Sequence, residues 1–339
     1  MENLYEMKKI HLILIIIFCT LNTSCQETIK LPDRLTNSLL YTESKDEEGI
    51  GAGGFSEIIA FDLSTNTTHR LTNDRYSDRY PSYSALTNTL AFESKRFSDP
   101  EIVGLTADSK IFILNLTDKS LKSLDLYKGP GNNGLDEQFM PVFSNNGEKI
   151  CYTQYVGNLP RPYYLFNYNF STDSVYLLQT DLRMPIKYAW SEDDNRIFFT
   201  VLGKRLMANR DEDIYMVNIL EKSSQELIKK DSTENTIGDF KQNKILYVSR
   251  NSAYASDHFI KILDVSTHNE LFSSNMNEFG FKEIKSPVFE SNDMIYFIGN
   301  PKQFEGATGD DIYKMNLVTK KIERVTYTKL MKDDLSFIK

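Results

Sequence analysis

SEIIAFDLSTNTTHRLTND, residues 56–74, carries the pattern that decides the fold. A mostly apolar strand leads to Asp62, a polar residue between two apolar neighbours. A polar turn at residues 64–66 follows, and a second short strand ends the stretch. Two such strands joined by Ser, Thr and Asn predict an antiparallel hairpin.

The same hairpin pattern recurs five more times along the chain of 339 residues. The relatives begin at Ser109, Pro162, Glu212, His258 and Asp310. The polar marker residues are Asp62, Asn115, Asn169, Asn218, Asp264 and Asn316, which are 53, 54, 49, 46 and 52 residues apart. A near-constant period of this size is the sequence signature of a repeat architecture.

A second hairpin lies between these repeats. Its copies read YPSYSALTNTLAFES (80–94), MPVFSNNGEKICYTQ (140–154), IKYAWSEDDNRIFFT (186–200), TIGDFKQNKILYVSR (236–250) and SPVFESNDMIYFIGN (286–300). In each copy an aromatic residue ends the first strand, namely Tyr83, Phe143, Trp190, Phe240 and Phe289. The chain therefore predicts six units, each made of four short antiparallel strands.

A single four-stranded sheet cannot bury both of its faces. Six sheets arranged radially pack face against face, so we expect an all-β, six-bladed β-propeller with the aromatic residues between blades. Propellers commonly close by pairing both chain ends in one blade. Residues 334–338 are one candidate for the innermost strand of the first blade, and residues 26–31 are the other.

The N-terminal segment is predicted to be a secretory signal. From Met7, two lysines precede an apolar run over residues 10–18, which is too short to span a bilayer. The segment ends in LNTSC, which resembles a bacterial lipobox and makes Cys25 the expected lipid attachment site. The alternative is cleavage elsewhere that leaves Cys25 free. We expect a signal peptide over 1–24, a short tether over 25–32 and one propeller over 33–339.

The repeats also carry a family resemblance. DIYKMNLVTKKIERVT, IIAFDLSTNTTHRLTND and YPSYSALTNTLAFESKR are similar to the WD-like β-propeller repeat of TolB-like proteins, over most of residues 33–328. The match is weak at residues 236–249, where the Pro and Ser of the pattern are missing. The resemblance implies the fold and, through TolB, protein partners in the envelope. It does not by itself specify chemistry.

Composition limits the function. The formal net charge of -8 without a basic run argues against nucleic acid as a partner. The sequence has no G-x-S-x-G or H-E-x-x-H motif and only four His, so we expect no catalytic residue and no protein-bound metal or cofactor.

Charged residues just ahead of the inner strands form the first candidate site. They are Asp78, Arg79, Glu137, Arg183, Glu234 and Glu283. At the mouth of the channel they would make a mostly acidic ring, suited to a cation or a cationic peptide. The alternative is that they are solvated loop residues.

Loop aromatics form the second candidate site. Tyr155, Tyr163, Tyr254 and Phe304 lie in or beside Gly- and Asn-rich connections that we expect at one rim, where they would contact a protein or a glycan. The alternative is that these loops are simply polar and exposed.

Together these features predict a monomeric, lipid-anchored binding module of the bacterial cell envelope. We expect it at the outer membrane, periplasmic or surface-exposed, attached to the membrane only by its lipid, with an envelope protein, peptide or glycan as partner. The rival is a carbohydrate-active or peptide-processing enzyme with its site at the channel mouth.

Overall fold

The computed structural model describes residues 31–44, 55–74, 76–96, 109–124, 137–155, 163–179, 184–202, 212–229, 233–251, 257–302, 309–328 and 330–339. Cys25, Arg183, Tyr254 and Phe304 lie outside these ranges. Residues from Leu31 to Lys339 form one compact unit.

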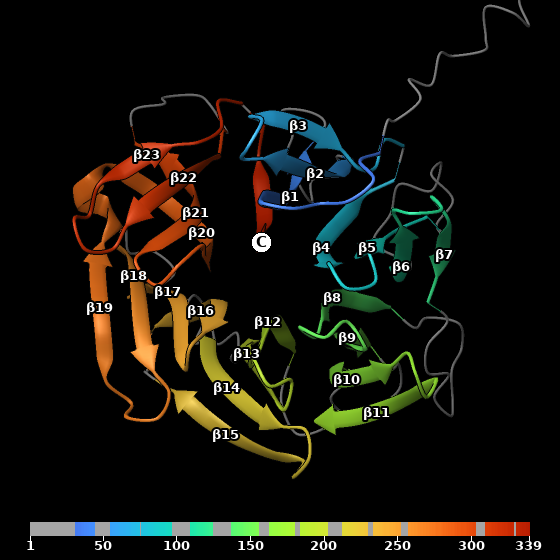
Figure 1. Ribbon diagram of the computed structural model, residues 1–339. Coiled ribbons are helices and arrows are strands. Elements are labelled where there is room, and N and C mark those ends of the chain that lie inside the picture. Colours follow the sequence, from blue (N-terminus) through green and yellow to red (C-terminus); the bar gives the residue numbers. More distant parts are fainter. Residues whose placement is uncertain are drawn as a thin grey trace, which may run out of the picture. The chain divides into compact units, whose positions relative to one another are not determined.

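This unit is a ring of six four-stranded antiparallel blades, as the repeats predict (Figure 1). Blade 1 contains β24 (Lys332–Ile338), β1 (Ser38–Ser44), β2 (Ser56–Asp62) and β3 (Thr67–Arg70). Blade 2 contains β4 (Asp78–Ser84), β5 (Thr89–Ser94), β6 (Lys110–Asn115) and β7 (Leu121–Ser123). Blade 3 contains β8 (Gln138–Phe143), β9 (Lys149–Tyr155), β10 (Tyr163–Asn169) and β11 (Ser174–Gln179).

The second half of the ring repeats this order. Blade 4 contains β12 (Pro185–Trp190), β13 (Arg196–Leu202), β14 (Glu212–Asn218) and β15 (Ser223–Ile228). Blade 5 contains β16 (Glu234–Lys241), β17 (Lys244–Arg250), β18 (His258–Asp264) and β19 (Glu270–Asn275), and one parallel pairing of Glu212 with Glu234 joins it to blade 4. Blade 6 contains β20 (Phe281–Phe289), β21 (Met294–Pro301), β22 (Asp311–Asn316) and β23 (Ile322–Arg324), preceded by the 3-10 turn η1 (Met276–Phe279).

The C-terminal strand closes the ring. β24 pairs antiparallel with β1, with Ser38 opposite Ile338, and becomes the innermost strand of blade 1. Of the two closing strands that the sequence left open, the structure therefore selects the C-terminal one. Residues 332–338 come from the end of the chain and pair next to residues 38–44 near its start, so both ends hold one blade together.

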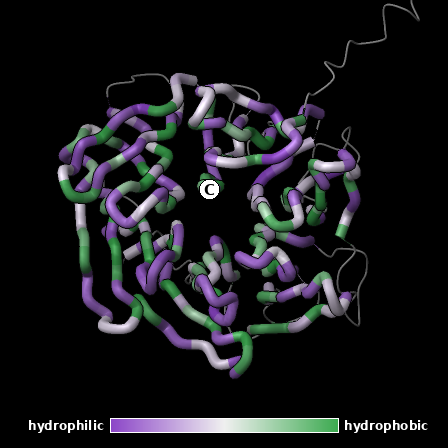
Figure 2. The backbone as a smooth tube through the Cα atoms, viewed as in Figure 1, coloured by the Kyte–Doolittle hydropathy of each residue, from purple (hydrophilic) through white to green (hydrophobic). Residues whose placement is uncertain are grey.

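Apolar side chains form six buried clusters, one at each interface between neighbouring blades. Successive residues of a strand face opposite sides of its sheet, so Leu40 packs toward blade 2 while Leu39 packs toward blade 6. The aromatic residues that end the inner strands join these clusters, as expected, for example Phe143 and Trp190. Figure 2 shows hydrophobic residues in every blade rather than gathered in a single core.

The marker residues of the sequence repeat build the turn between the third and fourth strand of each blade. Their side-chain oxygens accept hydrogen bonds from the backbone N–H groups two and three residues later, as Asp62 does from Ser64 at 2.7 Å and Thr65 at 3.2 Å. The equivalent acceptors are Asn115, Asn169, Asn218, Asp264 and Asn316. Asp and Asn have the side-chain length that suits this short-range turn, which explains the periodic marker.

The two ends of the blades differ. One face, the turn face, carries the tight turns that join third to fourth strands in every blade and first to second strands in blades 2 to 6. At the opposite face, the connection face, the inner strands begin, the second strands end and the third strands begin. Tyr155 ends β9 and Tyr163 begins β10, so both lie at the connection face.

Candidate functional site in the central channel

The inner strand of every blade is irregular at the same place. The pairing of β4 with β5 shifts between Arg79 and Ser82, and the other five blades show the same shift at the equivalent position. Pro81, Pro141 and Pro287 lie at these shifts. Proline has no N–H to donate to the sheet, so within sheets it is found at edges and bulges.

At the bulges, five residues adopt a positive φ. They are Tyr80, Met140, Lys187, Ser286 and Asp334, with φ between 45° and 57°. Such conformations cost about 1 kcal/mol or more in residues other than glycine, and the surrounding sheet must hold them. In blade 5 the bulge contains Gly238, where an added Cβ would lie 2.1 Å from the carbonyl oxygen of Pro287. This close approach explains why the Pro of the repeat is missing from this unit.

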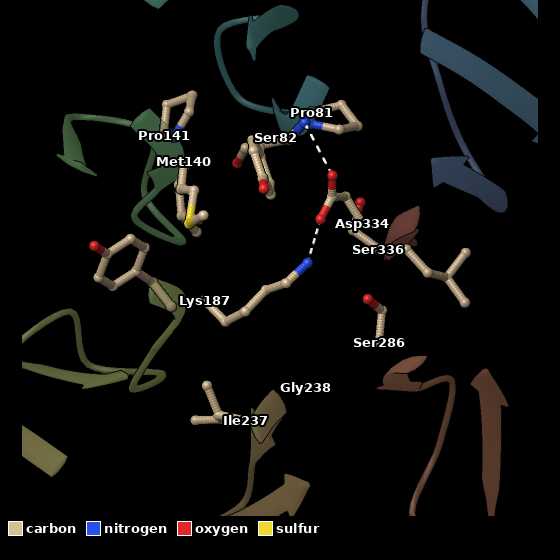
Figure 3. Close-up of a pocket in the computed structure, with 14 residues that line it drawn as sticks. Pro81, Ser82, Met140, Pro141, Lys187, Ile237, Gly238, Ser286, Asp334 and Ser336 are labelled. Carbon is tan, nitrogen blue, oxygen red and sulfur yellow. Dashed lines mark hydrogen bonds and ion pairs between the residues drawn. The ribbon is translucent and has the colours of Figure 1, made fainter. Parts of the chain in front are cut away.

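The bulges turn one residue of each blade toward the centre of the ring. Around a cavity of about 110 Å³ they place one residue from each blade, namely Tyr80, Met140, Lys187, Ile237, Ser286 and Asp334. Figure 3 labels all of these except Tyr80. The wall is completed by Pro81, Pro141, Val142, Tyr188 and Leu335, with Ser82, Gly238 and Ser336. A mostly apolar wall with a few converging polar groups is typical of a ligand site.

Lys187 and Asp334 are the charged residues among those that line the cavity. Lys187 belongs to blade 4 and Asp334 to blade 1, on opposite sides of the ring, and their side chains meet in a direct ion pair across the channel (Figure 3). The Lys187 Nζ also lies 3.7 Å from Asp333 Oδ1 and 5.2 Å from the centre of the Tyr80 ring. Burial opposes the charge of Lys187, but Asp334 and Asp333 outweigh it and raise its pKa.

A second charged group stands beside this pair. Arg79 donates from Nη2 to the Tyr80 hydroxyl at 3.0 Å, and its guanidinium carbon lies 4.7 Å from the centre of that ring. Glu93, opposite Arg79 in the sheet, accepts from Ser109 Oγ at 3.1 Å. Burial raises the pKa of Glu93 to about 7 although Arg79 acts in the opposite direction.

Blade 6 adds a third cation, Lys285, whose Nζ lies 3.1 Å from Asp310 Oδ2. Desolvation lowers the pKa of Lys285, but Asp333, Asp310 and Glu283 more than compensate and raise it. Asp333 is surrounded by Lys187, Lys285 and Arg79, and these cations hold its pKa below the usual value despite burial. The closing strand β24 thus places the adjacent carboxylates of Asp333 and Asp334 among three cations.

The structure places the sequence-predicted charged residues in different surroundings. Asp78 is fully buried, and its two oxygens accept from Arg96 Nη1 at 2.9 Å and Nη2 at 2.7 Å. Burial raises the pKa of Asp78 to about 6 against the pull of Arg96. Glu234 is buried as well and pairs with Arg250.

Glu137 and Glu283 are half-buried, and Arg79 lies in the channel beside the cavity. None of the described members of this predicted set is among the residues that line the cavity. Asp78 and Glu234 do not face a shared ligand-binding space, because each pairs with an Arg of its own blade. A binding role for the charged set stays a prediction.

The predicted rim aromatics come together in one described pair. Tyr155 and Tyr163 meet edge to face with their ring centres 5.2 Å apart. The ring centre of Phe139 lies 6.3 Å from that of Tyr163. Tyr80, Lys187 and Asp334 were not predicted from the sequence as site residues. The signal that could have identified the first of them is its place just before the Pro of a Pro-x-aromatic repeat.

Within the described ranges, no group of three or more His, Cys, Asp or Glu residues could hold a metal ion. Nor do those ranges contain a helix with the length and apolar character needed to cross a membrane. The absence of a bound metal or cofactor and the lipid anchor on Cys25 stay predictions.

No family model matches the chain, and no curated protein matches it in sequence. Solved structures do match. TolB from Acinetobacter baumannii superposes with a TM-score of 0.61 at 16% identity, covering 88% of this chain and 66% of that one. The putative TolB from Agrobacterium tumefaciens gives 0.58 at 14%, covering 85% and 89%. An oligogalacturonate lyase in complex with manganese gives 0.54 at 14%, covering 80% and 70%.

These likenesses show the β-propeller fold and a structure similar to TolB and other propellers. This chain spans about two thirds of the length of the Acinetobacter TolB. Because the matching proteins include both TolB and a lyase, the shared fold alone does not distinguish a binding protein from an enzyme.

Proposed function

We propose that this protein is a non-catalytic binding module of the bacterial cell envelope, held at the membrane by a lipid on Cys25, whose central channel takes a segment of a protein or peptide. The observation that carries the proposal is the convergence of one bulged residue from each of six blades on one cavity. Five strained backbone positions and one tightly packed glycine surround a single cavity. Because strained positions cost stability, their convergence favours a ligand site there.

The chemistry of the wall favours a peptide. Met140, Ile237 and the prolines offer apolar contact, while Ser82, Ser286 and Ser336 offer hydroxyl groups. Tyr155 and Tyr163 add aromatic surface at the connection face, where the channel opens beside the starts of the inner strands. Aromatic residues of this kind dominate the energy of protein contacts.

The test uses a displayed library of random peptides selected on the purified protein. We expect selected peptides to lose binding when Ser336→Trp fills the cavity and to keep it in Ser223→Trp, the same change on the exposed outer strand β15. Selected peptides that bind Ser336→Trp as tightly as the unchanged protein would refute a channel site.

The enzymatic alternative is tested on the same protein. Panels of glycans and peptides are incubated with the chain and with Glu137→Ala and Glu283→Ala, and products are followed by mass spectrometry. Turnover that disappears in both variants would overturn the non-catalytic proposal.

A further inference from the structure

Lys187 enters the channel as a bound ligand would. Its side chain starts from a bulge in blade 4 and crosses to blade 1, where its ammonium group meets Asp334, 147 positions away in the sequence. The surroundings of that ammonium are two adjacent carboxylates, of Asp333 and Asp334, and the ring of Tyr80. Carboxylates together with an aromatic ring are the groups that recognise an alkylammonium ion.

Asp334 also has contacts that do not involve Lys187. Asp334 Oδ2 also lies within hydrogen-bonding distance of Thr42 Oγ1 at 3.5 Å and the backbone N–H of Tyr80 at 3.4 Å. These contacts come from β1, which pairs with β24, and from β4, the inner strand of blade 2. The carboxylate is therefore held by its own and the neighbouring blade, whereas Lys187 approaches alone from the far side of the ring.

Lys187 is the more exposed partner of this ion pair. Its side chain is 24% exposed, against 5% for Asp334. A long lysine side chain has many rotamers, and rotation about its own bonds would withdraw the ammonium without moving the backbone. The arrangement is thus a preformed site whose present occupant is a flexible side chain of the same protein.

We propose that Asp333, Asp334 and the Tyr80 ring form a binding site for an alkylammonium group, such as the lysine side chain of a peptide, and that Lys187 occupies this site until the ligand displaces it. The inference rests on the proposed function, because it names the chemistry by which the channel would select its peptide. Because Lys187 belongs to the same chain, its ammonium group is present at a high local concentration beside the site. It therefore weakens the binding of every ligand that uses the site.

The test measures binding of N-acetyl-lysine methylamide by isothermal titration calorimetry. Lys187→Met removes the competing ammonium, and we expect the probe to bind about ten- to a hundredfold tighter than to the unchanged protein, as for one regained charged hydrogen bond. Adding Asp334→Asn to this variant removes the gain. Asn keeps the size of Asp and tolerates positive φ, so the backbone at this bulge is retained.

Two controls isolate the mechanism. Lys229→Met removes an equal charge beside the exposed outer strand of blade 4 and leaves the channel unchanged, and it gives no gain. N-acetyl-norleucine methylamide has a similar chain without the ammonium, and it does not bind. Lys187→Gln provides a second variant of nearly native length if Lys187→Met does not fold.

The proposal is overturned if a folded Lys187 variant binds the lysine probe no tighter than the unchanged protein. It is also overturned if the gain persists with Asp334→Asn, or if the norleucine probe binds equally well. Failure of this inference can be distinguished from failure of the proposed function. Selected peptides that depend on Ser336 but not on Asp334 would support a channel site of different chemistry.

Discussion

Replacing Glu93 by Gln should make the protein more stable at neutral and alkaline pH. Glu93 is buried, Ser109 donates to one of its oxygens, and the other, Oε2, has no hydrogen-bond partner within the described part of the chain. Burial raises the pKa of this carboxyl to about 7 from an ordinary value of 4.5. The native state therefore holds a proton on Glu93 over a pH range in which the unfolded chain has released it.

The direction of the pH effect is set by this difference. Below about pH 4.5 the carboxyl is protonated in both states, and folding has no electrostatic cost at this site. As the pH rises from there to about 7, the unfolded state gains from ionisation and the native state does not, so the free energy of unfolding falls. The full difference corresponds to roughly 3 kcal/mol, an upper value because the native site can relax.

Urea unfolding of the unchanged protein and Glu93→Gln at about pH 4.5, 6, 7 and 8 tests this reasoning. Gln keeps the acceptor for Ser109 but does not ionise, so its stability relative to Glu should rise by up to about 3 kcal/mol between the lowest and highest pH. Glu221→Gln, on an exposed turn, serves as the matched control and should show no such trend. If Glu93→Gln instead loses stability as the pH rises, Glu93 is an ionised partner of Arg79 and the argument fails.

Four further predictions concern other residues. Asp78→Asn should become more stable relative to the unchanged protein as the pH rises from about 4 to 6, because burial raises the pKa of Asp78 to about 6, Asn does not ionise, and Asp74 still pairs with Arg96; denaturant unfolding at both pH values measures this. Lys332→Met should speed amide exchange in β24, because the buried ammonium holds that strand through the carbonyl of Asp310 at 2.9 Å; unchanged exchange would contradict this role. Asn316→Ala should cost about 1 kcal/mol of stability in thermal unfolding by deleting one turn acceptor. Cys25→Ser should move the protein from the membrane fraction to the soluble fraction on cell fractionation.

The regular features of the fold could be predicted because they depend on short-range rules. Asn316 accepts from residues two and three positions later, so its role is visible within four residues of sequence. Phe143 and Trp190 end strands at a fixed distance from a turn, and their burial between blades is expected from the need to cover both faces of each sheet.

The charged sites could not be predicted in the same way. Asp78 and Glu234 look alike from the sequence, as acidic residues at the start of an inner strand. Whether each faces solvent or an arginine depends on how far its strand is shifted against the next, and in the structure Arg96 and Arg250 neutralise them. The register of the strands cannot be read from the sequence. The sequence alone therefore does not distinguish a carboxylate that binds a ligand from one in a buried ion pair.

The sequence by itself determined that six similar four-stranded sheets must pack around a ring, because the period and the apolar pattern allow no single sheet to bury both faces. Only the tertiary structure decided that β24 closes the first blade and that Lys187 meets Asp334 across the channel. The physical reason is distance along the chain. Turns and strands are set by neighbouring residues, whereas the channel is formed by six bulges that come together only once the ring is closed.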